Sequence, residues 1–410
     1  MRHVGERTGQ TGATSLVTVL LIGQEPPPHH GQAVMISTFV RAEHEGVAVD
    51  FLPMRYSTTV AEIGRIRVNK AWQLVRLVGE AVRRLLVRRI DVIYYPPAGA
   101  GRLPIIRDIV TLLVLRRLGR PIVYHFHALG LEDSYRSLGG VSRALFRAAY
   151  FRPDVCICPA AANLAEIEFL QPAATAVVPY GIPDVETADF GDASTVRSNL
   201  AAESATDPPP PHRDGSDHAT ILFVGNLIES KGVWRLLRLA QRLEAADMKA
   251  RVVLVGSPPS NALLERYAQH PAARSGRAIF TGPLFGKDKL ALLRNADVFC
   301  FPSTYESENF PVVLLEALRA GLPIVSSAWR GIPEIVENGV CGFLVDADDD
   351  AALFDGVRVL LKDKALRQMM GSAGRARYEA RFKQQRYVAE MDRVLRDAVR
   401  ARAGPAASRY

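Results

Sequence analysis

The chain has 410 residues, 48% of them hydrophobic, and a formal net charge of +8. It is long for one domain, and its apolar content is enough to bury a core in each of two. Its four cysteines show neither the C-x-x-C spacing of a zinc or redox site nor a disulfide framework, which excludes both classes and indicates reduced cysteines of a cytoplasmic protein.

The positive charge lies mainly in the first part of the sequence. Residues 1–180 hold 21 Lys and Arg against 14 Asp and Glu, whereas the remaining residues hold 30 against 29. The excess is greatest from Arg65 to Arg120, where 13 basic residues accompany three acidic ones. Such a segment favours an anionic lipid surface or another polyanion as a partner, and solvated helix faces are the alternative.

Residues 1–15 are expected to form a disordered tail, and the apolar run LVTVLLIG, from Leu16 to Gly23, follows it. This run is too short to span a membrane and lacks a small-residue cleavage site, so we interpret it as a buried strand. Further short apolar runs, each followed by a helical stretch, are VAVDFL, DVIYYP, PIVYHFH and DVCICP. This alternation predicts a parallel sheet covered on both faces, and hence a Rossmann-like domain over residues 16–185.

The composition then changes to Ala, Ser, Asp and Pro, and DPPPPHRDGSD cannot form a central strand or a continuous helix. Residues 186–218 are therefore predicted to be a linker or a mobile insertion. The alternation restarts with ATILFVG, ARVVLVG, RAIFTG, DVFCFPS and LPIVSS, which predicts a second Rossmann-like domain over residues 219–380. Residues 381–410 are expected to form a helix that packs back on the first domain. The predicted fold is thus α/β, with two doubly wound parallel-sheet domains facing a central cleft.

Strand ends in parallel sheets bind anions because helix N-termini there offer unpaired N–H groups and the positive end of a dipole. The first candidate turn is VGNLIESKGVWRLL, where a strand ends at Gly225 and Lys231-Gly232 is expected to open a helix. It is not a P-loop, which needs Gly-Lys-Ser/Thr after four spacer residues. Lys231 could place an ammonium beside a phosphate, and an ordinary solvated lysine is the alternative.

The second candidate turn is STYESENFPVVLLEALRAGLPIV. Asn309, Phe310 and Pro311 stand where a helix is expected to begin, and proline suits the first helical turn, so the amides of that turn are free to bind a ligand. Glu308 precedes this turn, and Glu316 follows the apolar run VVLL inside the helix. A carboxylate on such a buried helix is costly without a partner, which would be either a structural arginine or a pair of ribose hydroxyls.

Two weaker candidates lie in the first half. In YHFHALG, His125 and His127 share one face of a strand end, but no clustered carboxylate or cysteine completes a metal shell, so no metal site is expected and a structural role remains open for at least one of them. In GQEPPPHHGQA, Gly31 lies in a proline-rich loop where the backbone could pass close to a ligand.

In combination, these features resemble the retaining GT-B glycosyltransferases of the family-4 type, also described as glycosyl transferases group 1. The resemblance is carried by the two Rossmann-like halves, the Lys231-Gly232 turn, ADVFCFPS, the pair Glu308 and Glu316, and GIPEIVENGVCGFLV. It covers nearly the whole chain outside the tail and the linker, and it is densest from Thr220 to Val345.

The resemblance implies a role for each matching residue. Lys231 would contact the donor diphosphate, Glu308 the hydroxyls of the donor sugar, and Glu316 the ribose of the nucleotide. His127 would sit near the donor sugar and the acceptor, and Gly31 would line the diphosphate from the first domain. The catalytic residues would therefore be His127, Lys231 and Glu308.

The rest of the implied donor site is made by Gly225, Asn226 and the turn of Asn309, Phe310 and Pro311. Many family members carry an arginine where this chain has Asn226, so one expected phosphate cation is missing. Lys231 with the helix-end amides, or an arginine from elsewhere such as Arg330, would supply the charge. The segment VPYGIPD, around Gly181, would mark the crossing between the domains.

The activity that the resemblance implies is transfer of a sugar from a nucleotide diphosphate sugar to a sugar or lipid-linked acceptor, with retention and without a metal or cofactor. The process would be cell-surface polysaccharide or glycolipid synthesis. The first domain would recognise the acceptor, and its basic segment would hold a cytoplasmic enzyme peripherally on an anionic membrane, the inner face of the plasma membrane.

Three other classes of protein compete with this interpretation. A nucleotide-binding oxidoreductase or epimerase would need a dinucleotide fingerprint, and the nearest match, AGAGRLP around Gly99, lacks the third glycine and has Pro104 instead. A nucleic-acid binder would suit the arginine-rich half, but the sequence shows no series of base-stacking aromatic residues and no recognised module, so no nucleic acid is expected. A catalytically degenerate GT-B protein that acts as a binding partner is the alternative that Asn226 suggests.

Overall fold

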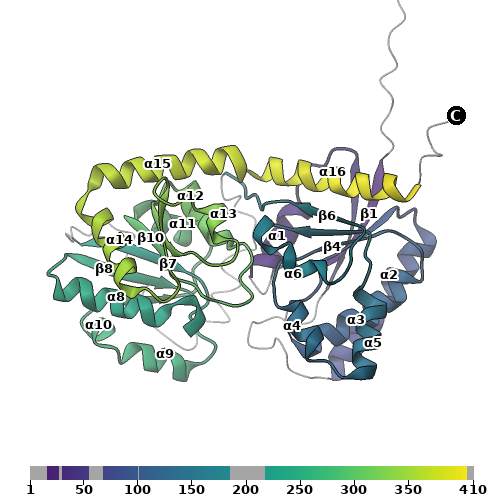
Figure 1. Ribbon diagram of the computed structural model, residues 1–410, viewed down its shortest axis with the longest axis horizontal. Helices are drawn as coiled ribbons and strands as arrows, with labels where there is room; N and C mark the ends of the chain where they lie inside the picture. Colours follow the sequence, from purple (N-terminus) through teal and green to yellow (C-terminus); the bar gives the residue numbers. More distant parts are fainter. Residues whose placement is uncertain (1–15, 27–29, 55–67, 100, 185–217, 404–410) are drawn as a thin grey trace, which may run out of the picture.

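The computed structural model describes residues 16–26, 30–54, 68–99, 101–184 and 218–403. The predicted tail, nearly all of the predicted linker and the first two basic residues of the arginine-rich segment lie outside these ranges. Within the described residues, the chain forms two parallel sheets of six strands each. The predicted fold class, two doubly wound parallel-sheet domains, is confirmed (Figure 1).

The first sheet has the strand order β2-β1-β3-β4-β5-β6. Its strands are β1 (Val17–Gly23), β2 (Val47–Pro53), β3 (Val92–Tyr95), β4 (Ile122–His125), β5 (Val155–Cys158) and β6 (Ala174–Val177). Each of the five predicted apolar runs forms one of these strands. The edge strand β6 was not predicted, because its sequence ATAV is half exposed and lacks a buried apolar run.

Helices cover both faces of this sheet. They are α1 (Gly31–Val40), α2 (Val68–Val87), α3 (Arg102–Arg116), α4 (Leu131–Arg136), α5 (Gly140–Tyr150), the 3-10 turn η2 (Ala161–Asn163) and α6 (Ala165–Glu168). Side chains alternate along β1: Leu20 and Ile22 join the core beneath α2, α3 and α5, whereas Val19 and Leu21 join the core beneath α1. This two-sided burial explains why the strands are continuous apolar runs.

The second sheet has the strand order β12-β11-β10-β7-β8-β9. Its strands are β7 (Ala219–Val224), β8 (Ala250–Val255), β9 (Ala278–Gly282), β10 (Val298–Phe301), β11 (Ile324–Ser327) and β12 (Gly342–Val345). The helical segments are η3 (Glu229–Lys231), α8 (Val233–Ala245), α9 (Asn261–Ala268), α10 (Pro271–Arg274), α11 (Gly286–Asn295), α12 (Val312–Arg319), α13 (Ile332–Ile335), α14 (Asp350–Lys362), α15 (Lys364–Arg381) and α16 (Gln384–Ala403). In the described residues, no helix is long and apolar enough to cross a membrane.

The last two helices run along one side of both halves, with α15 beside the second sheet and α16 beside the first (Figure 1). The chain crosses between the halves where Ile182 lies beside Lys383: the amide of Ile182 donates to the carbonyl of Phe382 at 2.9 Å, and its carbonyl accepts from the amide of Gln384 at 3.0 Å. Further along α16, a carboxylate oxygen of Asp392 accepts from the amide of Glu45 at 2.9 Å. The last helix therefore packs against the first half of the chain.

Close packing at this crossing requires a glycine. A Cβ atom on Gly181 would lie 2.3 Å from the carbonyl oxygen of Lys383 and 2.8 Å from the Cβ of Tyr387. We expect Gly181→Ala to destabilise the protein by about 1–3 kcal/mol, because the backbone must move apart, and to lower the midpoint of thermal unfolding. The matched control is Gly139→Ala, where φ is −76° and no described atom lies within 4 Å of the added Cβ. Equal midpoints for the two variants would contradict the close approach.

Candidate active site

Lys231 lies in the turn that joins β7 to α8. The chain leaves β7 through Gly225 and the exposed Asn226, forms η3, and enters α8 after Gly232. The helix thus begins two residues later than the Lys231-Gly232 turn had suggested. Gly232 has a φ of +84°, and a Cβ there would lie 2.4 Å from the carbonyl oxygen of Pro302. This contact requires glycine and brings Lys231 against the loop that follows β10.

Lys231 and Glu308 form an ion pair, Nζ to Oε2, so the structure brings together two of the three predicted catalytic residues. Their side chains are only 12% and 9% exposed. The hydroxyl of Ser303 donates to the same oxygen of Glu308 at 3.0 Å. The ammonium also lies 5.3 Å from the ring centre of Phe301 and 4.9 Å from that of Tyr305, within cation–π range.

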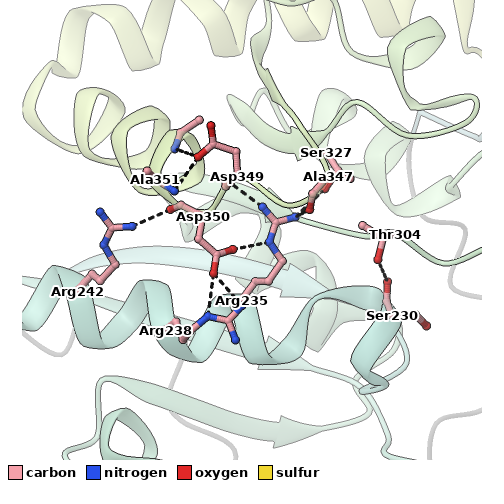
Figure 2. A network of polar contacts seen from close by, with 11 residues as sticks. Ser230, Arg235, Arg238, Arg242, Thr304, Ser327, Ala347, Asp349, Asp350 and Ala351 are labelled. Atoms are coloured by element: carbon pink, nitrogen blue, oxygen red, sulfur yellow. Dashed lines mark hydrogen bonds and ion pairs between the residues drawn. The ribbon is translucent and has the colours of Figure 1, made fainter.

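The two loops that carry this ion pair are also joined through their main chains. The amide of Thr304 donates to the carbonyl of Ser230 at 2.7 Å, and the Thr304 hydroxyl lies 3.3 Å from the same oxygen (Figure 2). The position of Lys231 relative to the loop after β10 is therefore set by backbone hydrogen bonds as well as by charge.

A network of arginines anchors α8 behind this site. Figure 2 shows Arg235, which is 8% exposed, reaching from α8 to the ends of β11 and β12 and the start of α14. Its guanidinium donates to Asp350 at 2.7 Å, to the hydroxyl of Ser327 at 3.2 Å and to the carbonyl of Ala347. Burial opposes ionisation of Asp350, but hydrogen bonds from Arg235 and Arg238 lower its pKa. The network fixes the helix that Lys231 precedes.

Glu316 has a lysine as its protein partner. Lys289 of α11 donates to its Oε1 at 2.7 Å, and among the described residues its buried Oε2 has no hydrogen-bond partner. Sequence reasoning named an arginine or ribose hydroxyls as the partner and missed Lys289. The lysine satisfies one carboxylate oxygen and leaves the other available to a ligand.

His127 follows β4 and is held by Tyr180, whose hydroxyl lies 2.6 Å from its Nδ1. The neighbouring His125 pairs in the same way with Tyr94 at 2.7 Å, and the two imidazole rings are 4.2 Å apart. Burial lowers the pKa of His125 to about 3, and burial followed by the charges of His125 and His30 lowers the pKa of His127. Both histidines are therefore neutral near pH 7.

The remaining hydrogen-bonding atom of His127, Nε2, is buried and has no partner in the part of the chain that the structure describes. In the same described residues, no group of three or more His, Cys, Asp and Glu side chains is arranged to hold a metal ion. One nitrogen of His127 is thus buried and without a hydrogen-bond partner among the described residues.

Asn309 connects the two halves of the chain through its side chain. Its amide donates to the carbonyl of Phe126 at 2.7 Å, and its carbonyl oxygen accepts from Asn163 at 2.6 Å. The residue is 2% exposed. Phe126 directly precedes His127, and Asn309 directly follows Glu308. These bonds therefore fix the segment that contains His127 against the segment that contains Glu308.

The two residues that follow Asn309 also have structural roles. Phe310 is buried, with its ring 5.5 Å from that of Tyr180 and 6.0 Å from that of Phe382. Pro311 is the N-cap residue of α12, so the helix begins one residue after the predicted proline position. The side chains of this turn are thus engaged within the protein, and only its backbone amides are left to make the donor contacts that the sequence suggested.

Two further contacts across the halves are made by the loop after β11 and by α13, which follows it. Glu334 accepts from the amide of Ala162 at 2.8 Å, and Arg330 forms an ion pair with Glu166 of α6. Arg330, the named alternative for the missing phosphate cation, is therefore engaged by the first half. Asn226 itself is exposed at the end of β7.

Gly31 begins α1, and the side chain of His30 caps that helix by accepting from the amide of Ala33 at 3.3 Å. A Cβ on Gly31 would meet no described atom within 4 Å. Residues from the other three candidate turns approach one another: Lys231 pairs with Glu308, and Asn309, which follows Glu308, bonds to Phe126, which precedes His127.

Residues 209–377 match the family described as Glycosyl transferases group 1. Among solved structures, HepE of Anabaena in complex with UDP and glucose has a TM-score of 0.66 at 18% identity, covering 93% of this chain and 100% of that chain. Sucrose-phosphate synthase from Thermosynechococcus elongatus has a TM-score of 0.68 at 19% identity, covering 94% and 100%. The chain therefore has the fold of the GT-B glycosyltransferases.

Three of the curated proteins that match in sequence are similar to part of this chain. Sulfoquinovosyl transferase SQD2 of Arabidopsis thaliana is 32% identical over 39% of this chain and 30% of that protein. Phosphatidyl-myo-inositol mannosyltransferase of Mycobacterium leprae is 39% identical over 38% and 40%, and glycogen synthase of Mycobacterium tuberculosis is 34% identical over 40% and 39%. The matches span less than half the length of these relatives. The second half of the chain is therefore similar to the family of glycosyl transferases group 1.

Proposed function

We propose that the chain transfers a glycosyl group from a nucleoside diphosphate sugar to an acceptor hydroxyl, with retention of configuration, in the synthesis of a cell-surface polysaccharide or glycolipid. The observation that carries this proposal is the buried pair of Lys231 and Glu308, which lies at the carboxyl ends of β7 and β10 within the family-matched segment. Solved structures of the similar HepE of Anabaena are complexes with UDP, with UDP and glucose, and with UDP-glucose, which supports a nucleotide-sugar donor.

In the free protein, Lys231 and Glu308 neutralise each other. An entering diphosphate would attract the ammonium of Lys231 and release the carboxylate of Glu308 toward the hydroxyls of the sugar. Ser303 would continue to hold one oxygen of that carboxylate, as it does at 3.0 Å. The ribose would bind the free oxygen of Glu316, whose other oxygen is held by Lys289 at 2.7 Å.

The reaction breaks the bond between the anomeric carbon and the phosphate oxygen, and the diphosphate leaves with the electron pair. The acceptor oxygen bonds to the same carbon, and its proton passes to an oxygen of the departing diphosphate. Lys231 would stabilise the charge that develops on the leaving diphosphate, in the role that a divalent ion plays elsewhere. His127, neutral and with a free Nε2, would lie beside the reacting sugar and the acceptor.

The direct test is a thermal-shift and calorimetric screen against UDP, GDP, ADP and their common sugar conjugates, without added metal. A ligand at 100 times its dissociation constant should stabilise the protein by about 2.7 kcal/mol. Binding of one nucleotide with turnover of its sugar conjugate is the expected result. Binding without turnover or donor hydrolysis would instead favour the degenerate binding protein that Asn226 suggests, and no binding at all would contradict the donor site.

We expect Glu316→Gln to weaken nucleotide-sugar binding by roughly tenfold, because an amide accepts weaker hydrogen bonds from ribose than a carboxylate does. Calorimetric titration with the donor measures this change. The control is Glu379→Gln on α15, whose side chain is 47% exposed. Unchanged donor affinity in Glu316→Gln would remove the ribose assignment.

We further propose a sugar or lipid-linked sugar as the acceptor, bound by the first half of a cytoplasmic protein at the inner face of the plasma membrane. The support is the charge of that half, +7 over residues 1–180 against +1 for the rest. Acceptor loops in the first half would then face the surface from which a lipid-linked substrate is drawn.

A further inference from the structure

Exposed apolar side chains concentrate on three helices of the first half. Of the 13 large hydrophobic side chains that are exposed in the described residues, eight lie on α2, α3 and α5. These eight are Trp72, Val75, Leu86, Val87, Ile106, Val110, Val141 and Leu145. Single exposed apolar residues are normal on a protein surface, but such a concentration on neighbouring elements is a mark of a binding surface.

The three helices are neighbours in space. Helix α3 packs against both α2 and α5, and Figure 1 shows them together at one end of the first half. They cover the same face of the sheet, since their inward residues belong to one core. We refer to the solvent-facing sides of α2, α3 and α5 as the three-helix face.

In helix α2, the exposed apolar residues lie on a different side from those that pack in the core. Its inward side is formed by Leu77, Ala81 and Leu85, spaced four apart and buried against the sheet. Trp72 and Leu86 lie on the opposite side and are 64% and 72% exposed. The helix is therefore apolar on two sides, and packing on the sheet accounts for only one of them.

Helix α5 repeats this arrangement over a shorter length. Val141 and Leu145 are 78% and 45% exposed, at a spacing of four, and Ala144 and Ala148 are exposed on the same side. Its inward side holds Phe146, which is fully buried. Exposed apolar residues therefore line the outward side of α5 as well as that of α2, so they belong to the three-helix face as a whole.

The charges of these helices are almost all positive. Their sequences contain nine Lys and Arg against two acidic residues, Glu80 and Asp108. Asp108 is fully buried and accepts from the Tyr95 hydroxyl and the Ala98 amide, each at 2.7 Å. Glu80 is held by Arg83 and Arg84. Among the described residues of the three helices, no carboxylate is left unpaired.

We propose that the three-helix face docks the protein on an anionic lipid bilayer, with Trp72 and Leu86 among the side chains that enter the interface and with its arginines beside the lipid phosphates. A basic surface with interspersed large apolar residues suits a headgroup region, where charge and hydrophobic burial act together. A second copy of the chain would bring like charge against like. The proposal deepens the proposed function, on which it rests only for the source of a lipid-linked acceptor.

The test is flotation of the full chain with large unilamellar vesicles, in the absence of donor and acceptor. Binding is expected to vesicles that contain 30% phosphatidylglycerol and not to pure phosphatidylcholine, and it should weaken as salt screens the charges. In Trp72→Ser/Leu86→Ser, the partition coefficient should fall by roughly tenfold for each side chain. The matched control is Val340→Ser/Met369→Ser in the second half, where both residues are exposed, and it should float as the wild type does.

Three results would overturn the proposal. The first is failure of the wild type to float with anionic vesicles at low salt, and the second is equal flotation of the two double variants. The third is a concentration-dependent dimer in sedimentation velocity without lipid that only Trp72→Ser/Leu86→Ser abolishes, which would assign the face to self-association. Because donor binding is measured separately by calorimetry, a loss of docking and a failure of the glycosyltransferase proposal can be told apart.

Discussion

Replacing Lys231 with alanine is expected to lower kcat by roughly 100-fold or more, the cost of losing one preorganised electrostatic contact to a leaving group. The Lys231 side chain is 12% exposed and ion-paired with Glu308, and its ammonium lies 5.3 Å from the ring centre of Phe301 and 4.9 Å from that of Tyr305, so its position is fixed before a ligand arrives. Water cannot supply an equivalent charge at this point. Steady-state turnover of the donor identified by the binding screen measures the effect.

The control is Lys362→Ala, which removes an exposed lysine at the end of α14 and should leave kcat unchanged. Removal of Lys231 also leaves the carboxylate of Glu308 buried without its cation, so the unfolding midpoint must be measured alongside. Addition of Glu308→Gln to Lys231→Ala should restore stability without restoring turnover. A stable Lys231→Ala variant with wild-type kcat would show that the diphosphate binds elsewhere.

The second large effect is expected from Asn309→Leu, which should lower kcat by about 100-fold although the side chain does not face the donor. The substitution removes the bonds to Phe126 and Asn163, at 2.7 and 2.6 Å, that hold the segment containing Glu308 against the segment containing His127. A displacement of about 1 Å between reacting groups is enough to produce a loss of this size. The measurement is kcat and KM for donor and acceptor, with kcat changing more than the donor KM.

A matched control is Asn295→Leu, which places the same side chain at an exposed asparagine of α11. A purely structural role for Asn309 would appear as a lower unfolding midpoint with normal kcat below that temperature. Such a result would contradict the idea that this residue positions the catalytic groups.

The fold could be predicted from the sequence because most strands are continuous apolar runs bounded by turn residues. Two strands were not predicted. The edge strand β6 consists of small, largely exposed residues, and β12 is only four residues long and lies within the segment GIPEIVENGVCGFLV. Helix starts at Lys231-Gly232 and Pro311 were misplaced by one or two residues. Their position depends on capping geometry that the local pattern does not specify.

The candidate site was predictable only where its residues lie close together in sequence. Glu308 and Glu316 share one loop and helix, whereas Lys289 reaches Glu316 from 27 residues away and Asn163 meets Asn309 across 146. No periodicity or composition encodes such pairings, since they depend on how the whole fold places helices and loops that are distant in the sequence. In the same way, the sequence of α2 could not show which of its two apolar sides faces outward.

The path of α16 means that the two halves seen in the sequence are not the two units that fold. This helix follows the second half in the chain, yet its buried Tyr387, Met391 and Leu395 pack in a core with residues of β1 and β3. A fragment that ends near residue 185 would lose this packing and leave part of one face of its sheet uncovered. To separate the halves, an experimenter must graft residues 384–403 onto the first, so the natural dividing line of this molecule is discontinuous in the gene.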